Sequence, residues 1–130
     1  MSTKRIIYAT AFCLYMAAVV YLCFARPENM PQLPMTWFGL PADKIGHFLM
    51  FAPFPLLGYK VLETDNISAT KKFMLLAVVS TLGLGIAIST EQLQAMLAYR
   101  SAEIMDIAAD AAGIVIGGIV CILHIFGIKR

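Results

Sequence analysis

The stretch DKIGHFLMF, residues 43–51, joins an acid, a base and an imidazole to an apolar run that continues to Leu62. Because 60% of the 130 residues are hydrophobic, this run has the composition of a membrane-spanning helix. An ionisable side chain inside a bilayer costs free energy, and for that reason it marks a functional site by default. Whether Asp43, Lys44 and His47 form such a site depends on which other polar residues reach the same depth.

The composition of the whole chain is that of a membrane protein. Charged residues make up 14% of it, whereas a soluble domain carries roughly 25%. The mean hydropathy is +0.79. The net charge is only +2 and the basic residues are scattered, which argues against a nucleic-acid partner. The three cysteines lie in apolar runs without a CxxC spacing, so we interpret them as small hydrophobic residues.

Four apolar segments are each long enough to cross a bilayer, because ~20 helical residues span its ~30 Å core. They cover residues 6–24, 43–62, 73–97 and 104–126. The first is longer than the ~7–15 apolar residues of a signal peptide. Pro53 and Pro55 predict a kink or a re-entrant turn in the second segment, because proline lacks the amide proton. The predicted fold is a single all-α domain over residues 1–130, a bundle of four transmembrane helices.

The distribution of Lys and Arg predicts the orientation of this bundle. With four spans, the N-terminus, the middle loop and the C-terminus lie on one side and hold seven of the ten basic residues. Basic residues collect on the cytoplasmic side, so both termini are predicted to be cytoplasmic. The start of the second segment, the end of the third and the start of the fourth then meet at the outer face.

Polar residues of three segments and one turn fall at this outer end. We predict that they line one ligand-binding polar pocket: Asp43, Lys44, His47, Glu91, Gln94, Arg100, Asp106 and Asp110. Spacings of three and four residues place the members from each segment on one helix face. Gly113 and Gly117 continue the face of the fourth segment and allow close helix packing. Taken singly, each residue has a structural reading, such as a helix N-cap for Asp43.

These residues resemble the pattern of the VanZ-like family of small bacterial membrane proteins. The matching pieces are Asp43-Lys-x-x-His47-Phe, Glu91-x-x-Gln94, Arg100, Asp106 and Ala109-Asp110-x-x-Gly113. Asp110 stands where the family usually has Asn. The named member of the family is associated with low-level resistance to the glycopeptide teicoplanin. The resemblance therefore implies a role in the cell envelope and a location in the bacterial plasma membrane, without a defined mechanism.

The charges of the predicted pocket need compensation. Its four carboxylates outnumber Lys44 and Arg100, and crowded carboxylates at low dielectric cannot all stay ionised without partners. One solution is protonation of some carboxylates, and another is positive charge on His47 and Arg26. A third is a divalent cation, for which the candidate ligands are Asp43, His47, Glu91 and Asp106.

Four functions stay open at this point. We favour recognition of an envelope lipid or lipid-linked precursor, with Lys44 and Arg100 binding a phosphate, and with an effect on teicoplanin susceptibility. The first alternative is an intramembrane enzyme on such a lipid, with Glu91 or Asp106 as general acid or base and His47 as partner. A proton or ion path has less support, because the polar residues are confined to the outer half. A structural scaffold, whose polar layer fixes helix register, is the fourth. Ligand identity, cofactor and oligomeric state stay open.

Overall fold

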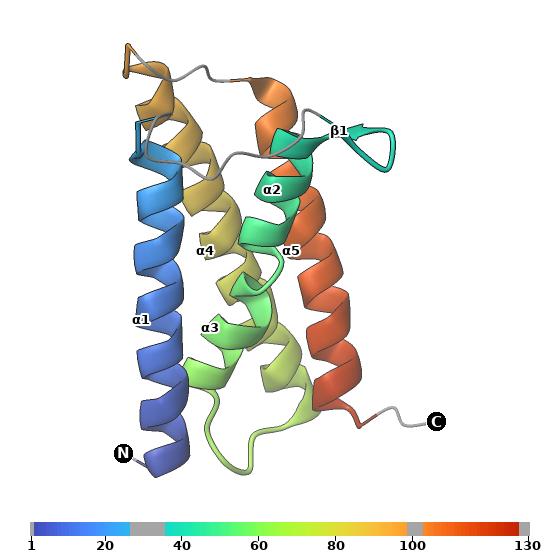
Figure 1. Ribbon diagram of the computed structural model, residues 1–130. Helices are drawn as coiled ribbons and strands as arrows, with labels where there is room; N and C mark the ends of the chain where they lie inside the picture. The colour runs from blue at the N-terminus through green and yellow to red at the C-terminus, as the bar shows by residue number, and fades with distance from the viewer. Residues whose placement is uncertain (1, 27–35, 99–102, 128–130) are drawn as a thin grey trace.

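The computed structural model describes residues 2–26, 36–98 and 103–127. Five helices dominate it: α1 (Thr3–Phe24), α2 (Ala42–Phe51), α3 (Phe54–Leu62), α4 (Ala69–Ala95) and α5 (Ile104–Ile125). They lie side by side as an elongated bundle (Figure 1). Strands β1 (Thr36–Trp37) and β2 (Leu40–Pro41) pair in antiparallel fashion as a short hairpin that precedes α2.

Four helical stretches are long and apolar enough to cross a membrane: Thr3–Phe24, Ala42–Leu62, Ala69–Ala95 and Ile104–Ile125. Each has at least 21 residues, which at ~1.5 Å per residue matches the ~30 Å hydrocarbon core. The predicted four-helix membrane bundle is thus confirmed. Hydroxyl caps fix two of the starts, since Ser2 Oγ accepts from the Arg5 amide and Ser68 Oγ from the Lys71 amide, both at 3.2 Å.

The second spanning stretch is divided into α2 and α3 at Ala52 and Pro53. Pro53 and Pro55 cannot donate amide hydrogen bonds to the preceding turn, which explains why a regular helix stops here. The kink angle and the cytoplasmic side of the bundle stay predictions.

Asp43 is not the N-cap of α2. The helix begins at Ala42 after Pro41, so Asp43 lies within its first turn and that alternative is wrong.

The glycines of α5 bring the break between α2 and α3 close. A Cβ atom at Gly113 would fall on the carbonyl oxygen of Phe48, and one at Gly117 on that of Ala52. Only glycine therefore allows this contact of backbone with backbone, as the spacing of Gly113 and Gly117 predicts. The consequence for the site is that α2 lies directly against α5.

Two apolar clusters join the remaining helices. Val19, Cys23, Phe51, Ala87 and Ile114 form one, and Tyr59, Leu76 and Cys121 form the other. In addition, the Tyr15 hydroxyl of α1 donates to the Met50 carbonyl of α2. Because lipid is as apolar as these side chains, packing and interhelical hydrogen bonds hold such a bundle together.

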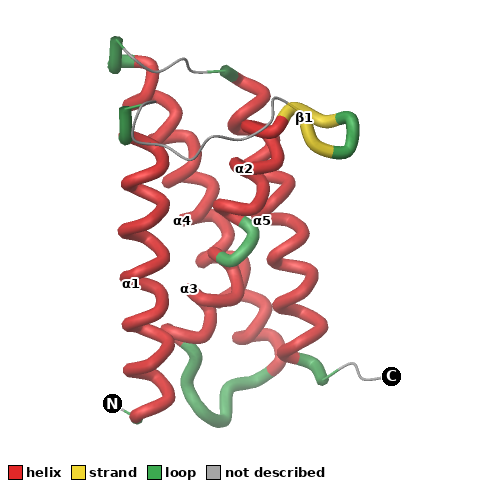
Figure 2. The backbone as a smooth tube through the Cα atoms, in the orientation of Figure 1, coloured by secondary structure: helices red, strands yellow, loops and turns green. Residues whose placement is uncertain are grey.

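The two ends of the bundle differ in content. The N-terminus, the end of α5 and the connection from α3 to α4 lie at one end, which we call the terminal end (Figure 2). The hairpin, the start of α2, the end of α4 and the start of α5 lie at the other, which we call the hairpin end. The polar residues of the predicted pocket belong to the hairpin end.

Candidate functional site

Ionisable side chains from α2, α4 and the start of α5 gather at the hairpin end. We call this group the polar cluster: Asp43, Lys44, His47, Glu91, Glu103, Asp106 and Asp110. In the described part of the chain it combines five carboxylates with one lysine and one histidine. The close contact at Gly113 holds α2 against α5. On α2, His47 follows Asp43 by four residues, and on α5, Asp110 follows Asp106 by four, so each pair lies on one face of its helix.

Lys44 lies on the first turn of α2 and contacts three carboxylates of the polar cluster. Its ammonium donates to Asp43 Oδ2 at 2.9 Å, to Glu103 Oε2 at 2.7 Å and to Asp106 Oδ1 at 2.5 Å. An ammonium group has three donors, and these three acceptors account for all of them. Lys44 therefore joins α2 to the start of α5.

His47 lies one helical turn deeper and links the same two helices. Its Nδ1 lies 2.8 Å from Oδ1 of Asp110, and its Nε2 lies 3.6 Å from Oδ2 of Asp106. An ionised carboxylate can only accept, so with Asp110 ionised this contact assigns a proton to Nδ1. This tautomer directs the Nε2 lone pair of the neutral ring toward Asp106.

Glu91 brings α4 into the polar cluster. Its Oε1 accepts the backbone N–H of Glu103, the residue that precedes α5, at 2.8 Å. A carboxylate here also interacts favourably with the positive end of the α5 dipole. Its other oxygen, Oε2, is buried and has no hydrogen-bond partner among the described residues, and the same is true of Asp110 Oδ2. Such unpaired oxygens are costly at low dielectric.

Gln94 has a different environment from the one predicted. Its side-chain amide is buried and donates to the backbone carbonyl of Cys23 at 2.7 Å. The acceptor is a carbonyl in the last turn of α1, where carbonyl groups commonly accept hydrogen bonds from outside the helix. This contact ties α4 to α1 and gives Gln94 a structural role.

Of the eight predicted pocket residues, the structure brings six together: Asp43, Lys44, His47, Glu91, Asp106 and Asp110. Arg100 lies outside the described residues. Glu103 is the member that sequence reasoning left out of the pocket, although its spacing of three from Asp106 places both on one face. That the group binds a ligand stays a prediction.

Three members can share a metal ion. One donor atom each from His47, Glu91 and Asp106 lies within 4.8 Å of the other two. Asp43, the fourth candidate ligand from the sequence, is outside this set; it is exposed and paired with Lys44.

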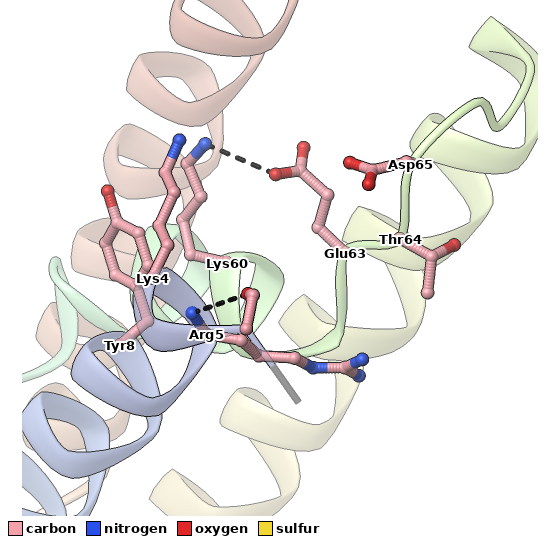
Figure 3. A pocket seen from close by; sticks show the side chains of 8 residues that line it. Lys4, Arg5, Tyr8, Lys60, Glu63, Thr64 and Asp65 are labelled. Carbon is pink, nitrogen blue, oxygen red and sulfur yellow. Dashed lines mark hydrogen bonds and ion pairs between the residues drawn. The ribbon is translucent and has the colours of Figure 1, made fainter.

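A cavity of about 350 Å³ lies at the opposite, terminal end. Figure 3 shows its basic side chains beside the connection after α3. Here Lys60 Nζ lies 3.3 Å from Glu63 Oε1, and Arg5 Nε donates to the Val61 carbonyl at 2.7 Å. Basic residues are typical of the cytoplasmic edge of a membrane protein, which is where the sequence predicts this end, and we assign no catalytic chemistry to the cavity. A second cavity, of about 300 Å³, is lined by apolar residues of α1, α3 and α4.

Comparison with known proteins gives one match. A family model described as VanZ/LLP1 matches residues 12–126. The matched range contains the whole polar cluster and both glycines that bring α2 against α5. Searches of curated proteins and of solved structures found no match.

Proposed function

We propose that this protein acts in the bacterial plasma membrane as an envelope-lipid receptor. The premise is that the chain belongs to the VanZ/LLP1 family and is a multi-pass membrane protein. In this proposal the polar cluster binds the headgroup of a lipid or of a lipid-linked precursor. Binding at this site modulates susceptibility to glycopeptides such as teicoplanin. The family assignment agrees with the resemblance inferred from the sequence.

The observation that carries the proposal is the buried, unpartnered oxygen of Glu91. The side chain is 4% exposed, and its Oε2 has no hydrogen-bond partner in the described part of the chain. A structural layer would be expected to satisfy its own buried acceptors, because each unsatisfied one costs about 1–3 kcal/mol. A ligand that brings donors or positive charge would remove this cost.

The depth of the polar cluster supports a headgroup as the ligand. The cluster lies at one end of helices whose length matches the ~30 Å hydrocarbon core, and in this proposal that end is near the lipid headgroups. The hairpin beside it carries Phe38, whose side chain is 99% exposed. Exposed aromatic rings are typical of membrane interfaces. A cytoplasmic location of both termini would place this end at the outer leaflet, where teicoplanin acts.

The contacts favour the carboxylates, not Lys44, as the groups that bind the headgroup. The sequence-based hypothesis was that Lys44 binds a phosphate. Its three N–H donors, however, already donate to Asp43, Glu103 and Asp106. Lys44 is better understood as the residue that holds these acids in place. Glu91 and Asp110 then present the free acceptors to hydroxyl or ammonium groups, or to a cation bound with the headgroup.

The first prediction concerns Glu91→Gln. Glutamine keeps an oxygen that can accept from the Glu103 amide, but it removes the charge at the unpartnered position. We expect the variant to bind phosphatidylethanolamine, whose ammonium group would donate to Glu91, at least tenfold more weakly than the wild type, which corresponds to about 1.4 kcal/mol. Native mass spectrometry of the protein in detergent, titrated with this lipid and with a polyprenyl pyrophosphate, measures the binding of each.

Glu63→Gln is the matched control, because Glu63 is a carboxylate at the terminal end. It should bind both lipids like the wild type. Equal binding by Glu91→Gln and the wild type would contradict the proposal. In a sensitive host at matched protein levels, teicoplanin protection should likewise be lost with Glu91→Gln and retained with Glu63→Gln, with vancomycin compared in parallel.

A second candidate function is an enzyme acting on the same class of lipid. The observation that favours it is the contact of His47 Nδ1 with Asp110 at 2.8 Å, since a carboxylate that orients a histidine is a common general-base arrangement. This reading requires turnover. Release of phosphate from the polyprenyl pyrophosphate that is lost in His47→Ala would support it, and stoichiometric binding of unchanged lipid would exclude it.

A further inference from the structure

We propose that His47, Glu91 and Asp106 bind a divalent metal ion, Zn²⁺ or Mn²⁺, at the centre of the polar cluster. The ion would sit between α2, α4 and α5 and would leave coordination positions open toward the headgroup level. Its use in holding a phosphate-bearing headgroup rests on the proposed function, whereas the metal site itself is tested without any lipid.

The spacing of the donor atoms suits a shared ion. His47 Nε2 and Asp106 Oδ2 lie 3.6 Å apart, which is too far for a hydrogen bond. Two ligands at about 2.1 Å from a tetrahedral zinc ion are separated by about 3.4 Å, so this pair is already at coordination distance. The three donors lie within 4.8 Å of one another, so the widest pair must close by at most about 1.4 Å to reach the separation of ~3.4 Å in a tetrahedral site.

The environment of His47 prepares its ring for metal binding. Asp110 is 1% exposed and its Oδ1 lies 2.8 Å from Nδ1. When this carboxylate is ionised it accepts from Nδ1, which leaves Nε2 unprotonated in the neutral ring. A histidine that ligates a metal commonly donates its other N–H to a carboxylate, which fixes the tautomer and raises the basicity of the ligand nitrogen. Asp110, which departs from the Asn of the family pattern, supplies that carboxylate here.

The second, independent observation is the unpartnered oxygen of Glu91. One carboxylate oxygen caps the start of α5, and the other is buried without a described hydrogen-bond partner. Its carboxylate belongs to the set that converges on His47 and Asp106. A metal ion would give this oxygen the partner that the described side chains do not provide.

Charge balance also favours a cation. Five carboxylates of the polar cluster face one lysine and one histidine, so the described group is negative even when His47 is protonated. Lys44 binds Oδ1 of Asp106, whereas Oδ2 faces His47. The ammonium and a metal ion therefore use different oxygens of the same carboxylate and do not exclude each other.

The donor set selects the kind of ion. Two carboxylates and an imidazole suit Zn²⁺ or Mn²⁺, while Ca²⁺ and Mg²⁺ prefer oxygen ligands alone. Three protein ligands leave at least one position open, as in zinc sites that accept an exogenous group. A phosphate oxygen of a lipid headgroup fits such a position by charge and by ligand type.

The test is metal binding by the full-length protein in detergent, stripped with a chelator and titrated with ZnCl₂ or MnCl₂. Elemental analysis gives the stoichiometry and calorimetry gives the affinity. We expect one ion per chain in the wild type, and an affinity at least tenfold lower in His47→Ala and Glu91→Gln. His124→Ala and Glu63→Gln are matched controls from the terminal end and should bind like the wild type.

Asp110→Asn keeps the proposal falsifiable if His47→Ala does not fold. Asparagine can still accept from His47 Nδ1 but is a weaker partner, so this variant should bind the ion about tenfold more weakly, in the range for such supporting residues. Cobalt substitution should give tetrahedral absorption bands in the wild type that weaken in Asp110→Asn. Absence of one-to-one binding in the wild type, or equal affinity in all variants, would overturn the inference.

The two proposals fail separately. If no ion binds but Glu91→Gln still loses the lipid, the metal site is wrong and the headgroup site stands. If one ion binds through His47 and lipid binding is unaffected by Glu91→Gln, the metal site stands and the proposed function is wrong.

Discussion

At the scale of single residues, the polar cluster depends on which partner each charged group meets. Lys44 neutralises acids from two helices, His47 joins α2 to Asp110, and Glu91 caps α5 while one of its oxygens lacks a described partner. Spacing in the sequence predicted which residues share a helix face. It could not predict that Gln94 turns to the Cys23 carbonyl, because the position of α1 beside α4 has no signature in the sequence.

Lys44→Met should destabilise the fold. The substitution keeps the apolar stem but removes the cation from three carboxylates. Asp43 and Glu103 are more than half exposed and can be hydrated, so the main cost comes from Asp106, which is 7% exposed. We expect a loss of about 1–3 kcal/mol in the free energy of unfolding, measured by titration of mixed micelles with SDS.

Lys60→Met provides the comparison for this prediction. Among the described residues Lys60 has one acidic partner, Glu63, at 3.3 Å, and this carboxylate is 30% exposed. Its replacement should therefore cost less than that of Lys44. Equal losses in the two variants would show that Lys44 does not organise the polar cluster.

At the scale of helices, the position of the site follows from the contact of α2 and α3 with the glycine face of α5. The four spans were predictable from length and hydropathy, and the interruption lies at the prolines that the sequence points to. The hairpin was not predictable. Its strands have two residues each, and its turn places Phe38 at φ 52° and Gly39 at φ 77°, a conformation for which Asn-Gly is the usual signal.

Gly113→Ala should destabilise the protein although alanine is the better helix former. The new Cβ would fall on the Phe48 carbonyl, so α2 would have to move away from α5 and the His47–Asp110 contact would lengthen. Gly85→Ala, on α4, meets no atom within 4 Å and should gain about 0.5–1 kcal/mol from helix propensity. Opposite signs in the free energy of unfolding are the expected result, and a gain in both variants would refute the close packing.

At the scale of the whole molecule, the bundle places an acidic cluster at one end and basic residues at the other. The distribution of Lys and Arg predicted this division, because the order of the four segments along the chain decides which loops lie at the same end. The convergence of α2, α4 and α5 on one point needed the three-dimensional packing. The result is a VanZ/LLP1 protein whose hairpin end gathers carboxylates, two of which have a buried oxygen without a described hydrogen-bond partner.

The most direct test of whether the polar cluster is a binding site is the Tm of the wild type and Glu91→Gln, each with and without phosphatidylethanolamine. A ligand at 100 times its Kd stabilises the folded state by about 2.7 kcal/mol, so the Tm of the wild type should rise. Glu91→Gln should have an equal or higher Tm without lipid, because a buried charge without a described partner is removed. At the same lipid concentration its Tm should rise about half as much or less, since a tenfold weaker Kd leaves about 1.4 kcal/mol of stabilisation. A lower Tm in the variant together with the same rise as the wild type would contradict the account and identify the cluster as a structural layer.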